Sequence, residues 1–223
     1  MTPLSFSVNF ISMKRTNTKL AQFIIDKLGQ VPPTLNHILD EAVIISRKYF
    51  DERELKIDNY LFPSLVRYEA KLLLELPEYK NIGYEFVSLS NNGLFIIYKC
   101  DGCYYKIRIR KADEDGDLPV QNLSKTLKQF YQNPTPFLPT IEENLNEYIS
   151  PERLNLVVVW DVDRNYALQN VYLVCTKNEF GEVHFADKIE HAATAIVGNA
   201  NFDDQADEID DIDILPIKKT KIN

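Results

Sequence analysis

Hydrophobic residues in the first third of the chain recur at the spacing of amphipathic α-helices. A first helix is predicted between the cap residues 16–18 and Gly29, and a second follows the prolines at 32 and 33. A third is predicted from about Pro63 to Pro77, because proline suits the first turn of a helix. Its expected hydrophobic stripe consists of Leu65, Val66, Tyr68, Leu72, Leu73 and Leu76.

The hydrophobic period changes after about residue 83, where segments rich in aromatic and β-branched residues begin. Turn signals such as Asn91-Asn92-Gly93 and Asp101-Gly102 separate these segments, as is typical of hairpins. A short helix is predicted at 123–131, between two groups of three strands. The six predicted strands are residues 84–90, 94–100, 103–110, 154–161, 167–177 and 182–189.

Together these elements predict an α+β fold, in which the N-terminal helices pack on an antiparallel sheet formed by two three-stranded meanders. In the second meander, a four-residue turn would place Lys177 opposite Glu182 and Cys175 opposite His184. One domain is expected at 1–198, with a helical part at about 1–80 and a sheet part at about 83–190. A disordered acidic tail is expected at 199–223.

Composition supports a folded protein that needs no disulfide or structural metal. The chain has 223 residues, of which 45% are hydrophobic and 26% are charged. Its three cysteines, without a secretory leader, suggest a reducing compartment, and we expect a cytoplasmic protein. Apolar runs such as Leu156–Trp160 are too short to span a bilayer, so no membrane contact is expected.

The formal net charge of −8 is unevenly spread along the chain. Seven acidic residues and no basic ones lie between Asn201 and Asp213, and three lysines follow. Ile209, Ile212 and Leu215 lie among or next to these acids, so the segment could order on a basic, apolar groove of a protein partner. The alternative is a solubilising end without a partner.

The most suggestive chemistry lies on the predicted strand at 103–110. Strand alternation places Tyr104, Lys106, Arg108 and Arg110 on one side, and Lys99 on the adjoining strand could extend this patch. Such a row can bind an acidic protein segment, including the protein's own tail, or the phosphates of nucleic acid. The alternative is a solvated strand whose charges discourage edge pairing.

Other clusters give weaker indications of chemistry. Cys100 and Cys103 are expected to flank a type I′ turn rather than bind zinc, and Cys175 is expected to be a buried structural residue. No cofactor and no metal site is expected, since phosphate-binding and dinucleotide-binding glycine motifs are missing from the sequence. A metal-dependent enzyme would need convergence of Asp113, Glu114, Asp115, Asp117, Asp161 or Asp163.

The sequence therefore favours a non-enzymatic interaction or regulatory protein. It would contact a protein partner through the basic strand and the acidic, hydrophobic tail. A nucleic-acid-binding protein, or a metal-dependent nucleic-acid-processing protein, is the alternative hypothesis.

Overall fold

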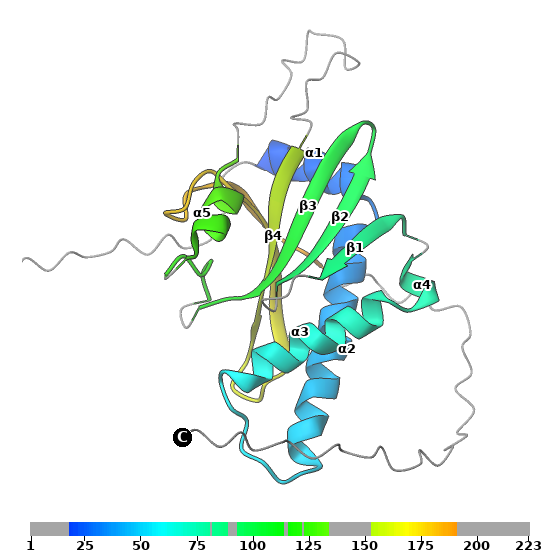
Figure 1. The fold of residues 1–223 in the computed structure, drawn as a ribbon, viewed down its shortest axis with the longest axis vertical. Coiled ribbons are helices and arrows are strands. Elements are labelled where there is room, and N and C mark those ends of the chain that lie inside the picture. The colour runs from blue at the N-terminus through cyan, green and yellow to red at the C-terminus, as the bar shows by residue number, and fades with distance from the viewer. Residues whose placement is uncertain are drawn as a thin grey trace, which may run out of the picture. The chain divides into compact units, whose positions relative to one another are not determined.

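Helices occupy the N-terminal part of the chain and strands most of the remainder (Figure 1). The computed structural model describes residues 18–80, 82–88, 93–113, 116–121, 123–133 and 153–190, all within one compact unit inside Met1–Ala192. The helices are α1 (Thr18–Leu28), α2 (Val31–Asp51), α3 (Leu61–Leu74), α4 (Pro77–Lys80) and α5 (Lys125–Tyr131). The strands are β1 (Tyr84–Ser88), β2 (Leu94–Cys100), β3 (Cys103–Lys111), β4 (Arg153–Val162), β5 (Leu168–Thr176) and β6 (Val183–Lys188).

The six strands form one mixed sheet in the order β1-β2-β3-β4-β5-β6. All neighbouring strands are antiparallel except β3 and β4, which run parallel. The α+β class is confirmed, but the prediction of an antiparallel sheet is wrong at its centre. Residues 112–152 separate β3 from β4 and include α5, and a connection of this length lets the chain return and enter β4 in the same direction.

One side of the sheet is covered by the N-terminal helices, and we call it the helical side. α1, α2 and α3 contribute Ile24, Leu35, Ile38 and Val66 to its core, and the sheet contributes residues such as Ile107, Leu156 and Trp160. The predicted stripe of α3 is partly wrong, because its buried residues are Phe62, Val66, Ala70 and Leu74. Tyr68 and Leu72 are exposed, since they lie on another face of the helix.

The opposite side of the sheet is divided into two halves. Over β4, β5 and β6 lies a second core, formed by α5 and the segment before it, which we call the covered half (Figure 1). Val157, Val159 and Val174 of the sheet pack there against Leu127 and Phe130 of α5. Over β2 and β3 no helix of the described residues contributes to an apolar core, and we call this part the open half.

Asn133, two residues after α5, fastens the covered half to the sheet. Its Nδ2 donates to the carbonyl oxygens of Asn155 and Thr176, each at 2.9 Å, and its Oδ1 accepts from the Asn155 N–H at 2.8 Å. Thr176 Oγ1 donates to the Tyr131 carbonyl at 2.8 Å. The end of α5 is therefore held to β4 and β5 by buried hydrogen bonds as well as by apolar packing.

The pairing of β5 with β6 differs from the predicted register. The Lys177 N–H donates to the Glu182 carbonyl at 2.7 Å, as the four-residue turn suggests. The register then shifts between Cys175 and Thr176, so that Cys175 lies opposite Phe185 and not opposite His184. This bulge places one extra residue on β6, which a turn-based prediction cannot detect.

Candidate functional site

The side chains of β3 alternate between the helical side and the open half. Tyr105, Ile107 and Ile109 are buried on the helical side, at 0–1% exposure. The residues between them, Tyr104, Lys106, Arg108 and Arg110, are partly exposed. The predicted grouping of these residues on one side of β3 thus agrees with the burial pattern of the strand. We call Lys106, Arg108 and Arg110 the basic row.

An additional arginine, Arg67 of α3, lies close enough to interact electrostatically with Arg108 and Arg110. We call Arg67, Arg108 and Arg110 the arginine cluster. Sequence patterns missed Arg67, because it lies on a helix far from β3 in the chain and no spacing rule connects the two elements. The sequence offered one signal: Arg67 directly follows Val66, which belongs to the buried face of the predicted helix.

Few protein groups accept hydrogen bonds from the guanidinium groups of the arginine cluster. Arg110 Nη1 donates to Tyr131 Oη at 3.4 Å, and Arg67 Nη2 donates to Ser64 Oγ at 3.1 Å. Arg67 Nε is buried and has no hydrogen-bond partner among the described residues. No carboxylate in the described ranges forms an ion pair with any of the three guanidinium groups.

The environment of the cluster disfavours its positive charges. Burial lowers the pKa of Arg67, and the nearby charge of Arg110 lowers it further. Burial also lowers the pKa of Arg108, again with a contribution from Arg110. Tyr131 opposes the shift of Arg108. Arginines remain protonated at neutral pH, so the lowered pKa values indicate that burial and neighbouring positive charges act against the charged forms.

The basic row also covers an aromatic ring. Phe95 of β2 lies opposite Arg108 in the register and is 3% exposed. Lys106 Nζ lies 4.3 Å from the centre of this ring and the Arg108 guanidinium lies 5.5 Å from it. Both contacts are within the range of cation–π interactions, so Phe95 helps to hold the two cations on the open half.

Lys99 and Tyr104 lie on the same side but differ electrostatically from the arginine cluster. They are opposite one another in the register of β2 and β3. Lys99 Nζ donates to Glu85 Oε1 at 2.9 Å and lies 5.2 Å from the centre of the Tyr104 ring. The hydrogen bond to Glu85 raises the pKa of Lys99. The charge of Lys99 is thus matched by a carboxylate, which those of the arginine cluster are not.

The carboxylates considered for an enzyme serve mainly in turns, where the structure describes them. Asp163 Oδ1 accepts from the N–H groups of Asn165 and Ala167, and Asp161 accepts from Asn170. Asp113 Oδ1 accepts from the Asp117 N–H at 2.8 Å. Within the described ranges, no group of three or more histidine, cysteine or acidic residues could hold a metal ion. Glu114 and Asp115 lie outside these ranges, as do the predicted contact residues Ile209, Ile212 and Leu215.

The cysteines lie in structural positions. Cys100 and Cys103 pair across the turn of β2 and β3, where Asp101 and Gly102 have φ of 49° and 75°, as a type I′ turn requires. Asp101 forms an ion pair with Lys27 of α1, which fixes this turn to the helical side. Cys175 is fully buried, and burial raises its pKa, which disfavours a reactive thiolate.

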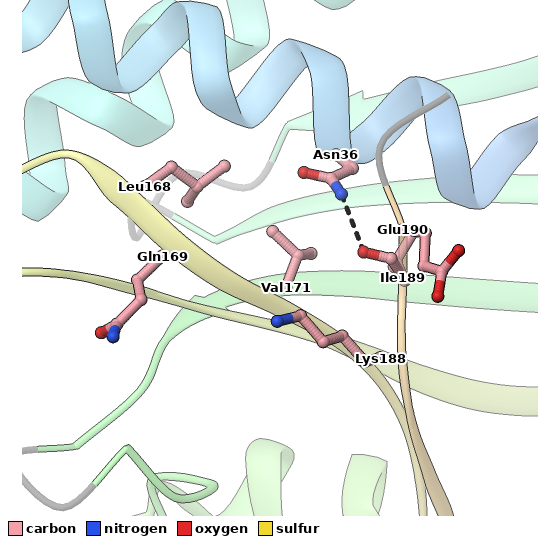
Figure 2. A pocket seen from close by; sticks show the side chains of 7 residues that line it. All are labelled: Asn36, Leu168, Gln169, Val171, Lys188, Ile189 and Glu190. Atoms are coloured by element: carbon pink, nitrogen blue, oxygen red, sulfur yellow. Dashed lines mark hydrogen bonds between the residues drawn. The ribbon is translucent and has the colours of Figure 1, made fainter. Parts of the chain in front are cut away.

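A pocket of about 300 Å³ lies elsewhere, between the first half of α2, the start of β5 and the end of β6 (Figure 2). Asn36 Nδ2 donates there to the Ile189 carbonyl at 2.8 Å, and Leu168 and Val171 provide an apolar wall. Asn36 Oδ1 is buried without a hydrogen-bond partner among the described residues, so solvent cannot reach it. The lining includes no residue of the basic row or the arginine cluster.

Several apolar side chains are exposed on α3 and just before it. Leu61, Tyr68 and Leu72 are 50%, 55% and 40% exposed, and their spacing of seven and four residues places them on one face of the helix. Tyr60 is 89% exposed. Exposed apolar surface of this kind often marks contacts with other proteins.

Comparison with protein-family models, with curated proteins and with solved structures finds no match. Among the described residues, no helix has both the length and the apolar character needed to cross a membrane. The candidate site therefore depends on the geometry and charge of the molecule itself.

Proposed function

We propose that this protein is a non-enzymatic interaction protein, which binds an acidic segment of a protein partner on the open half of its sheet. The basic row would provide the contact surface, together with Arg67 of α3, which lies close to Arg108 and Arg110. The acidic, hydrophobic tail, with Ile209, Ile212 and Leu215, would provide a second contact on the same partner.

The observation that carries this proposal is the missing counter-charge at the arginine cluster. Guanidinium groups that are partly removed from water are costly unless carboxylates or other acceptors compensate them. In the described part of the chain, no carboxylate pairs with Arg67, Arg108 or Arg110. A partner that supplies anionic groups would remove this cost on binding, which makes the cluster a favourable place for an acidic segment.

Two further observations favour a protein over nucleic acid. Bases of single strands stack on aromatic side chains, but Phe95 is buried under Lys106 and Arg108, and Lys99 lies over Tyr104. The exposed apolar face of α3, near Arg67 in the chain, would suit the mixed polar and apolar surface of a protein partner.

Nucleic acid is the second candidate, for one specific reason. Burial lowers the pKa of Lys106, and the nearby charges of Arg153 of β4 and of Arg108 lower it further, so the cations continue along β3 and onto β4. A line of cations can follow a phosphate backbone. Metal-dependent processing of nucleic acid would also require a carboxylate cluster, which the described residues do not contain.

Affinity purification of the full chain from its native host, with and without nuclease, tests the proposal. A protein partner should be retained after nuclease treatment and lost on the double change Arg108→Ala and Arg110→Ala. Lys99→Ala is the matched control, because this cation on the same side is already paired with Glu85. Retention of nucleic acid alone, dependent on the two arginines, would replace the proposal with the second candidate.

A further inference from the structure

The arginine cluster concentrates more positive charge than one carboxylate can neutralise. Arg108 and Arg110 lie two residues apart on the same side of β3, and Arg110 Nη1 lies 3.4 Å from Tyr131 Oη. Arg67 of α3, whose buried Nε has no hydrogen-bond partner among the described residues, lies close enough to interact electrostatically with both. A carboxylate carries one negative charge. A phosphoryl group of a monoester carries a charge of about −1.5 to −2 at neutral pH, together with three strong acceptor oxygens.

The cluster also has hydrogen-bond donors to offer. A guanidinium group has five N–H donors in a planar fork, which matches the spacing of phosphate oxygens. Arg67 and Arg110 each donate to one hydroxyl group, of Ser64 and Tyr131. Arg108 lies 5.5 Å from the centre of the Phe95 ring and close to Tyr131. Among the described residues its guanidinium group forms no hydrogen bond and no ion pair, so its N–H groups are available.

Resting on the proposed function, we infer that Arg67, Arg108 and Arg110 form a site for a phosphoryl group, which is carried by a phosphorylated segment of the protein partner. Lys106 and Arg153, farther along the same side, would then contact acidic residues that flank the phosphorylated position. Three guanidinium groups gathered in one place match the two charges of a single phosphoryl group. They match the evenly spaced single charges of a nucleic-acid backbone less well.

The first test uses inorganic phosphate, which requires no knowledge of the partner. Phosphate should raise the melting temperature of the full chain in a saturable manner, beyond the effect of sodium chloride at equal ionic strength. Arg108→Lys and Arg67→Lys keep the charge but lose the fork, and each should weaken phosphate binding about tenfold or more. Lys99→Ala should bind phosphate as the wild type does. A phosphate effect equal to that of chloride would overturn the inference.

The second test uses matched peptides of glutamate and glycine that differ at one central position. The phosphoserine peptide should bind about tenfold or more tightly than the peptides with serine or aspartate, measured by calorimetry at constant ionic strength. Equal binding of the phosphoserine and aspartate peptides would overturn the inference, while an acidic-segment function would stand. Tighter binding of an oligothymidylate than of the phosphopeptide would overturn both.

A third test separates the two proposals on the natural partner. A partner captured through Arg108 and Arg110 should be released by phosphatase treatment. A captured partner that stays bound after complete dephosphorylation would contradict the phosphoryl site and leave the proposed function intact.

Discussion

The two halves of one sheet side differ sharply although they meet at adjacent strands. Arg108 of β3 lies next to Val157 of β4 in the parallel register, and Arg110 lies next to Val159. Both valines are fully buried, whereas both arginines are partly exposed. The valines pack against α5 and the segment before it, so these described parts of the connection between β3 and β4 determine which strand positions become core.

The comparison teaches which half stabilises the fold and which half is available for binding. Burial of Val157, Val159 and Val174 under α5 removes apolar surface from water, which favours folding. The arginine cluster gathers like charges, which does not favour folding. Substitutions across the boundary should therefore have opposite consequences for stability and binding.

The largest effect on the free energy of unfolding is expected when an arginine, as found in the open half, replaces a valine of the covered half. Val157→Arg should lower the free energy of unfolding by about 4 kcal/mol or more, because an unpaired charge would be buried beneath α5. Urea unfolding followed by circular dichroism measures this loss. Val157→Ala, the control for lost packing, should cost only about 2 kcal/mol. A variant with arginine that is as stable as the alanine control would show that α5 does not exclude water there.

The second prediction concerns the attachment of α5, which creates the boundary. Asn133→Ala should lower the free energy of unfolding by about 2–3 kcal/mol, because it removes hydrogen bonds to Asn155 and Thr176 and leaves buried backbone groups without partners. Urea unfolding again measures the change. Gln132→Ala next to it, which removes an exposed contact with Glu179, should have little effect. Equal effects of the two changes would argue against Asn133 as the anchor.

Strand and helix positions could be predicted largely from local patterns, but the centre of the sheet could not. The turn at Asp101 and Gly102 has a specific local chemistry, and it fixes the pairing of β2 with β3. The parallel pairing of β3 with β4 depends on where a long connection brings the chain, which no local pattern encodes. Likewise, the register shift between Cys175 and Thr176 is not marked by the sequence of the turn that joins β5 to β6.

The candidate site was only partly predictable for a similar reason. Alternation along β3 was enough to group Lys106, Arg108 and Arg110, because strand geometry is local. The contributions of Arg67 and Tyr131 depend on how the middle of α3 and the end of α5 lie near β3 in space. The difference between Lys99 and the arginines was also hidden, since it rests on the cross-strand contact with Glu85.

The third prediction is the reverse exchange, in which a valine, as found in the covered half, replaces an arginine of the open half. Arg108→Val should keep the free energy of unfolding within about 1 kcal/mol of the wild type, with a gain at low salt, because it removes a like charge from the cluster. Urea unfolding at low and high salt measures both values, and the gain should shrink as salt screens the remaining charges. The same variant should lose partner binding. A marked loss of stability would show that Arg108 has a structural role that its contacts do not reveal.

The smallest expected effect is a pH dependence confined to the covered half, where His184 of β6 is 8% exposed. Burial lowers the pKa of His184, the charge of Lys177 adds to this, and a hydrogen bond with the backbone of Asn133 opposes it. Below the ordinary histidine pKa of 6.5 the unfolded chain then binds more protons than the folded one, so stability should fall as the pH decreases through this value. Urea midpoints of the wild type and of His184→Gln, compared at pH about 8 and about 6, measure this difference.

The wild type should lose more stability than the variant over this interval, whereas Arg108→Val should follow the wild type. Parallel pH profiles of His184→Gln and the wild type would show that the covered half admits the protonated imidazole, and would weaken the contrast between the two halves.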